Sequence, residues 1–158
     1  FLIKYYQPDN FYYIYGDYTS NSGRSYTIWC RIPDYYPTVC PKVYVHKPNP
    51  LIGYGGVSIN SYKVSHSMHT LENDSSGEVQ ICHWRQSRWD SSITLNKVML
   101  KAMLWFEAFE QHLVTGQPID NFVSTMKEAQ GRERWIHKKS KYEKRCSRLQ
   151  RVDKATIS

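Results

Sequence analysis

Three consecutive segments near the start of the chain alternate between apolar and polar residues with a period of two, and they constrain the fold strongly. FYYIYGDY (11–18), YTIWCRI (26–32) and KVYV (42–45) are rich in Tyr, Ile, Val and Trp. Polar turn residues separate the first two, and Pro41 directly precedes the third, where a strand tolerates proline. Short alternating runs joined by turns are typical of antiparallel strands. Residues 11–45 are therefore predicted to form a three-stranded meander.

An amphipathic helix is predicted after the strands. It begins near Ser92 or Thr94, which are good N-caps, and runs to about His112, before Gly116 and Pro118 stop it. Apolar residues recur on it at spacings of three and four, which creates one wide face that can cover a sheet. These residues are Leu95, Val98, Met99, Ala102, Phe106, Phe109 and Leu113. Strands first and helices afterwards predict an α+β fold.

The basic charge is concentrated at the end of the chain. Residues 1–130 carry eleven Lys or Arg and eleven Asp or Glu, whereas residues 131–158 carry ten basic and three acidic residues. The net charge of +7 therefore comes from the last segment. A second helix is predicted from Asp120, with Phe122, Val123 and Met126 directed inward. We expect one domain over residues 1–130 and a basic helical extension over residues 131–158.

Composition and cysteine spacing bound the class of protein. The 158 residues suffice for one core, and 41% hydrophobic and 15% aromatic residues exclude a disordered chain. No apolar run approaches the roughly 18 residues that a membrane span needs, and the start lacks the pattern of a signal peptide. The four cysteines form no CxxC pair. Together these features predict a cytoplasmic protein without disulfides.

A long irregular connection is predicted over residues 46–78, with one short strand at VSINSYKV (57–64). Long loops inside compact domains are usually functional. The GEVQICHW segment (77–84) that follows alternates again. One side of it carries Val79, Ile81 and His83, and the more polar side carries Gln80, Cys82 and Trp84. Cys82 is therefore predicted to be accessible, whereas Cys30 shares an apolar face and is predicted to be buried.

Two segments carry a resemblance to a known family. The first, YYPTVCPKVYV (35–45), matches a YP-x-x-x-P-K-V strand through Tyr36, Pro37, Pro41, Lys42 and Val43. The second, residues 77–99, matches an active-site segment through Ile81, Cys82, Trp89, Ile93, Thr94, Lys97 and Val98. In this combination the chain resembles the ubiquitin-conjugating enzymes over roughly residues 10–115. The WFEAFEQHLVTGQP run (105–118) resembles the bacterial branch of the family, some members of which accompany cGAS-like nucleotidyltransferases in antiphage (CBASS) signalling.

The resemblance implies roles for individual residues. Cys82 matches the cysteine that holds a protein's C-terminus as a thioester. The family's HPN tripeptide has a partial counterpart at residues 69–71, where His69 is kept and the asparagine is missing, so Asn73 is the nearby amide expected to replace it. An amine acceptor must lose a proton before it attacks, which His69 or His83 would assist. The family's acidic position falls at Val114, which leaves Thr115 and Asp120 as more distant substitutes.

The resemblance also implies partners. The donor is expected to be a ubiquitin-like protein or the C-terminus of a cGAS-like nucleotidyltransferase, and the acceptor an amine or water. The chain lacks a glycine-rich pattern for ATP, so an adenylating enzyme, either separate or already engaged with the donor, is expected to activate the donor. A thiol carrier of this kind needs no cofactor.

Three other interpretations remain open at the level of sequence. His66, His69, Cys82 and His83 include zinc-type ligands, but no CxxC accompanies them, and we predict no metal site. The basic segment 131–158, with Trp135 and Tyr142, has the charge and aromatic content of a nucleic-acid binder, although a helix that packs on a protein explains it better. A noncatalytic adaptor of the same fold is the third alternative, and such adaptors usually lack the cysteine.

Overall fold

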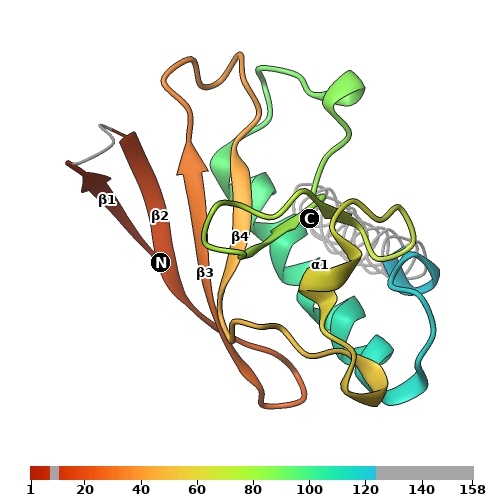
Figure 1. Cartoon of the computed structure of the whole chain (residues 1–158). Coiled ribbons are helices and arrows are strands. Elements are labelled where there is room, and N and C mark those ends of the chain that lie inside the picture. Colours follow the sequence, from red (N-terminus) through yellow and green to blue (C-terminus); the bar gives the residue numbers. More distant parts are fainter. Residues whose placement is uncertain (8–10, 124–158) are drawn as a thin grey trace, which may run out of the picture. The chain divides into compact units, whose positions relative to one another are not determined.

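The structure, a computed structural model, describes residues 1–7 and 11–123. It has an α+β fold: an antiparallel sheet of six strands is followed by a long helix (Figure 1). The strands are β1 (Leu2–Tyr6), β2 (Phe11–Thr19), β3 (Ser25–Ile32), β4 (Lys42–Lys47), β5 (Thr70–Leu71) and β6 (Val79–Ile81). Their order in the sheet is β1-β2-β3-β4-β6-β5. The predicted fold class and the predicted meander of β2, β3 and β4 are therefore confirmed.

Three parts of the fold differ from the sequence prediction. The short strand β5, which pairs with β6, lies inside the connection that was predicted to be irregular. The segment Leu2–Tyr6 was not predicted as a strand, yet it pairs with β2 as the edge strand β1. The predicted strand at 57–64 is wrong, since two short 3₁₀ helices, η1 (Tyr54–Gly56) and η2 (Ile59–Tyr62), occupy this region. Here the Asn60 side chain accepts a hydrogen bond from the backbone N–H of Leu51 at 2.8 Å. A side chain thus satisfies backbone groups that a sheet ladder would otherwise pair.

The helix α1 (Leu95–Thr115) has both of its predicted ends. The Thr94 hydroxyl accepts the backbone N–H of Lys97, and Gly116 closes the helix in the left-handed region at φ 71°. Only glycine adopts this conformation without steric cost, so Gly116 is well suited to the position. Helical residues resume at the predicted Asp120 and continue to Val123. Met126 and the predicted 131–158 extension lie outside the described residues.

The core lies between α1 and one face of the sheet. Phe106 and Phe109 of α1 are completely buried, and the ring of Phe106 lies 4.5 Å from that of Tyr26 on β3. Cys30 is fully buried in the same core, as predicted. Burial of each large apolar side chain contributes about 2 to 3 kcal/mol. In the described part of the chain, no helix is both long and apolar enough to cross a membrane.

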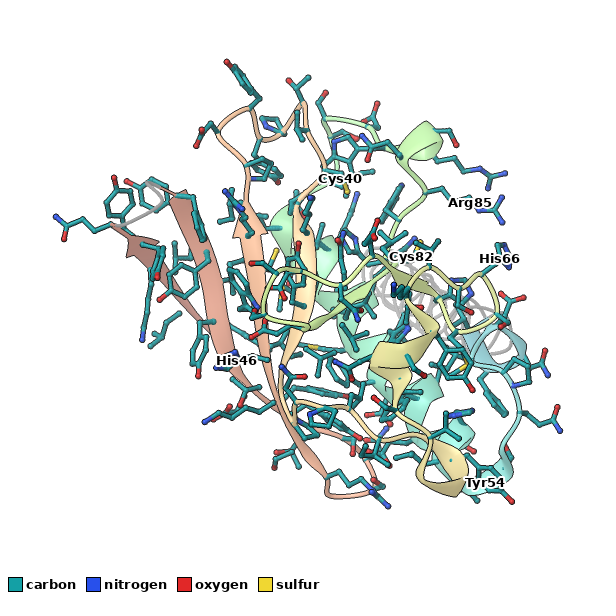
Figure 2. The ribbon with its side chains drawn as sticks, viewed as in Figure 1. Cys40, His46, Tyr54, His66, Cys82 and Arg85 are labelled. Carbon is teal, nitrogen blue, oxygen red and sulfur yellow. The ribbon has the colours of Figure 1, made fainter. Side chains whose placement is uncertain are left out.

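A polar network on the opposite face of the sheet fixes β6 against its neighbours. Glu78, directly before β6, is buried and accepts a hydrogen bond from the indole N–H of Trp29 on β3. Its other oxygen lies 2.6 Å from Nδ1 of His46 near the end of β4. Figure 2 labels His46 on the sheet. Because charge-assisted bonds are stronger than neutral ones, this network holds the strand that leads to Cys82.

Candidate active site

Cys82 follows β6 immediately, at the point where the sheet ends. Its backbone N–H donates to the carbonyl of His69 at 2.7 Å, which continues the β5–β6 pairing by one residue. The predicted alternation is confirmed: Val79, Ile81 and His83 are buried, whereas Gln80, Cys82 and Trp84 are partly exposed. The Cys82 thiol is therefore half-buried, and its sulfur lies 3.9 Å from the carbonyl oxygen of Trp84.

Two features of its environment shift the pKa of the Cys82 thiol in opposite directions. Burial raises the pKa of Cys82 above its usual value, whereas the positive charges of Arg85 and Lys101 lower it. Burial is the larger effect, so the group is a thiol rather than a thiolate at neutral pH. The same burial raises the pKa of Cys40 to about 11 and that of the core residue Cys30 to about 12. A base or a strongly activated acyl donor must therefore accompany any attack by Cys82.

His69, whose carbonyl is bonded to the backbone of Cys82, forms a hydrogen bond with a carboxylate. Its Nε2 lies 2.7 Å from Oδ1 of Asp120, and since a carboxylate can only accept, Nε2 carries the proton. The backbone of Asp120 is itself held, because its N–H donates to the carbonyl of Ser67 at 3.0 Å. His69 adopts a positive φ of 50°, which is uncommon for a residue other than glycine. The pair leaves Nδ1 of His69 as the basic nitrogen.

Two cations, Arg85 and Lys101, act electrostatically on the thiol. The guanidinium of Arg85 lies 3.4 Å from Nε2 of His66, and the His66 ring is 5.8 Å from that of His69. Figure 2 labels Cys82, Arg85 and His66 near one another at the edge of the molecule. The ammonium of Lys101, on α1, lies 3.5 Å from the centre of the Trp84 ring, which is a cation–π contact.

Hydrogen bonds order the loop that carries Arg85. The indole N–H of Trp84 donates to the carbonyl of Arg88 at 2.7 Å, and that of Trp89 donates to the carbonyl of Pro37 at 2.9 Å. The Tyr36 hydroxyl in turn donates to the carbonyl of Ile93 at 3.0 Å. Two segments far apart in the sequence, 35–45 and 77–99, are thereby joined beside Cys82.

Of the three supporting residues predicted from the sequence, the structure brings only His69 to Cys82. His83 faces the core, where its Nε2 donates to the carbonyl of Pro41 at 2.9 Å, and burial lowers its pKa to about 4. Asn73 follows Leu71, which pairs with Gln80, and so lies at the far end of the β5–β6 ladder. Its amide nitrogen donates to the carbonyl of Asn60 at 2.8 Å.

The site offers sulfur, imidazole and carboxylate groups without assembling them into a metal centre. Among residues 1–7 and 11–123, no three His, Cys, Asp or Glu side chains are placed to hold a metal ion. His66, His69 and His83 in particular have separate partners. The chemistry available at this site is that of a thiol with an imidazole base nearby.

From the sequence, Asp120 is predicted only as a distant substitute for the family's acidic residue, and Arg85 is not predicted as a site residue. Asp120 lies 51 residues from His69 in the chain, and only the packing of the segment after α1 brings the two together. Arg85 is three residues from Cys82, so its proximity in the sequence was the available signal.

The described residues thus include a partly exposed thiol whose backbone is bonded to His69, the partner of Asp120, and whose charge state is influenced by Arg85 and Lys101. Such a site supports attack on an activated acyl group, followed by transfer of that group. Comparison of the chain with family profiles, characterised proteins and solved structures finds no match.

Proposed function

We propose that the chain is a ubiquitin-conjugating-enzyme-like carrier, in which Cys82 accepts the C-terminal acyl group of another protein as a thioester. The observation that carries the proposal is the position of Cys82: it follows β6, is partly exposed, and is bonded through its backbone to His69. The contact between Trp89 and Pro37 supports it too, because these residues belong to the two segments that resemble the family.

The first step is acyl transfer to sulfur. Cys82 loses its proton and attacks the carbonyl carbon of an acyl adenylate or of a thioester on the activating enzyme. A carbon–sulfur bond forms, and AMP or the activating enzyme's thiolate leaves. The cations Arg85 and Lys101 favour the thiolate that attacks. Because the thiol is mostly protonated at neutral pH, the activation of the donor provides most of the driving force.

The second step transfers the acyl group to an amine. The amine attacks the thioester carbonyl, Nδ1 of His69 accepts the amine proton, and Cys82 leaves as a thiolate. Asp120 acts as a positioning residue, since its carboxylate fixes the tautomer in which Nδ1 is free. His83 has no part in this scheme because its ring is buried and bonded to Pro41.

The donor in this proposal is a ubiquitin-like protein or a cGAS-like nucleotidyltransferase with a free C-terminus, and the setting is bacterial antiphage defence. Both follow from the resemblance of residues 105–118 to the bacterial branch of the family. A separate adenylating enzyme completes the system. The proposal requires no cofactor on this chain.

The test is expression of the chain with its genomic neighbours, followed by non-reducing gels. The wild-type chain is expected to carry a protein adduct that a thiol reductant removes. Cys82→Ala abolishes the adduct, and Cys82→Ser converts it to an ester that resists the reductant. Cys40→Ala is the matched control and keeps the adduct. An adduct that survives Cys82→Ala would show that another residue carries it and would contradict the proposal. A chain that binds partners but forms no adduct would be an adaptor.

A further inference from the structure

A cavity of about 370 Å³ is formed by the end of β3, the loop that follows it and the start of β4. Cys40, which Figure 2 labels, is one of its lining residues. Sites for small molecules in proteins have volumes of about 300 to 1000 Å³. This cavity is therefore large enough for one small molecule, and the proposed thioester chemistry makes no use of it.

Two cations of the cavity wall lie opposite each other in the sheet. Arg31 of β3 and Lys42 of β4 are directly paired in the antiparallel register, and both are exposed. Like charges at such opposite positions destabilise a sheet. Within residues 1–7 and 11–123, neither cation forms an ion pair with a carboxylate, and the Arg31 guanidinium lies 4.3 Å from the centre of the Phe11 ring. A bound anion would relieve the repulsion between them.

The rest of the cavity wall is mostly apolar. Asp34 is the acidic residue among the lining residues, so the wall carries a net charge of +1 from two cations and one acid. Val39 contributes an apolar surface, and the ring of Tyr35 is 78% exposed. An exposed aromatic ring can stack on a planar group of a ligand. The cavity thus combines an anion-binding pair with a surface for a flat ring.

We propose that this cavity binds a small phosphate ester that carries a planar ring, of about the size of a nucleoside monophosphate. The phosphate lies between Arg31 and Lys42, and the ring packs on Tyr35 and Val39. A phosphate monoester carries about 1.5 to 2 negative charges at neutral pH, which matches two cations, whereas a carboxylate would leave one cation unmatched. Arginine can also bind two phosphate oxygens at once.

The test is an NMR titration of the full chain, labelled with ¹⁵N, with three probes at low salt. AMP has both the phosphate and the ring, adenosine lacks the phosphate, and inorganic phosphate lacks the ring. AMP is expected to shift the backbone amide signals of residues 31–42 and to bind at least about fivefold more tightly than either of the other probes. Inorganic phosphate or adenosine that binds as tightly as AMP would overturn the assignment of the ligand.

Variants of the cavity wall test the role of each group. Arg31→Gln combined with Lys42→Gln should weaken AMP binding about tenfold, because two exposed charge pairs are lost. Tyr35→Ala should weaken it about fivefold through the loss of stacking. Asp34→Asn removes the opposing charge and should strengthen it about twofold. Lys47→Gln, an exposed cation at the other end of β4, is the matched control and should bind AMP as the wild type does.

AMP binding that is unchanged in the Arg31 and Lys42 variant would overturn the inference. Shifts confined to signals outside residues 31–42 would overturn it too, because the basic segment 131–158 would then be the source of the binding. The titration involves no reaction of Cys82, so the failure of this inference and the failure of the proposed function are separate results.

Discussion

Glu110 on α1 and Cys82 directly after β6 both have polar groups around them, but these groups are used differently. The Glu110 carboxylate is buried and accepts hydrogen bonds from the hydroxyls of Tyr26 and Ser20, and Arg24 lies 3.3 Å from its second oxygen. Around Cys82 the thiol is partly exposed, its sulfur makes a long contact with the carbonyl of Trp84, and the nearby Arg85 is exposed. In the Glu110 cluster, both carboxylate oxygens therefore already have hydrogen-bond or ion-pair partners.

The difference separates a structural role from a chemical one. At Glu110 the buried charge is paired, and burial, together with the hydrogen bond to Glu110, raises the pKa of Tyr26 well above its usual value. The tyrosine stays protonated and donates at any physiological pH, so the cluster ties β3 to α1 permanently. At Cys82 the thiol is partly exposed and can be reached by a reaction partner. Substitutions should therefore change stability at the first cluster and reactivity at the second.

The largest effect is expected from Glu110→Ala. Removal of the carboxylate leaves the Tyr26 and Ser20 hydroxyls without their acceptor, and we expect a loss of about 3 to 4 kcal/mol in the free energy of unfolding. Urea denaturation measures it. Adduct formation at Cys82 should persist in the molecules that remain folded. Exposed Glu72→Ala is the control, with a change below about 0.5 kcal/mol. If Glu110→Ala unfolds with the same free energy as the wild type, the Glu110 cluster does not have the structural role that distinguishes it from the Cys82 site.

The second prediction concerns His83, on the buried side of the segment that exposes Cys82. Its folded-state pKa of about 4 lies below its ordinary value of 6.5, so the unfolded chain takes up the proton first as the pH falls. The contribution of this residue to stability is therefore complete above pH 6.5 and decreases by about 3 kcal/mol between pH 6.5 and 4. His83→Gln keeps a donor for Pro41 and should remove this part of the pH dependence.

Urea denaturation at several pH values compares the wild type with His83→Gln. The difference between the two curves isolates the residue from other titrating groups. Equal slopes between pH 6.5 and 4 would mean that His83 is solvated in solution, and the contrast between its side of the segment and that of Cys82 would be lost.

The smallest effect is expected from Asp120→Asn. Asp120 is partly exposed, so its ion pair with His69 contributes less than about 1 kcal/mol to stability. Transfer from Cys82 to an amine should nevertheless fall about tenfold, because His69 loses the partner that fixes its tautomer. Formation of the thioester should be unchanged. Single-turnover gels resolve the two steps, with Glu72→Gln as the control.

An Asp120→Asn protein in which both steps slow equally would indicate a general disturbance of the site. One in which transfer is unaffected would remove His69 and Asp120 from the mechanism and leave the cysteine alone.

Much of the fold was predictable because local patterns and final structure agree. The alternation in residues 11–45 favours strands, and the spacing of apolar residues after Thr94 favours a helix. The structure contains both. The strand predicted at 57–64 failed because Asn60 bonds the backbone through its side chain, which alternation cannot reveal. The edge strand β1 was missed because its exposed residues follow no inward and outward pattern.

The candidate site was predictable only in part. Alternation placed Cys82 on the more exposed side of its segment, and the same alternation placed His83 toward the core, where it cannot serve as a base. Asn73 was close to the cysteine in a count of residues, yet the antiparallel pairing of β5 and β6 carries it away.

The amino-acid sequence by itself determined the strands of the meander, both caps of α1, the burial of Cys30 and the accessibility of Cys82, because each depends on periodicity or on a few neighbouring residues. Only the tertiary structure decided which groups surround the thiol. His69 meets Asp120, and Lys101 meets Trp84, because segments that are distant in the chain pack against one another. Such meetings depend on the packing of whole elements, which no local pattern encodes.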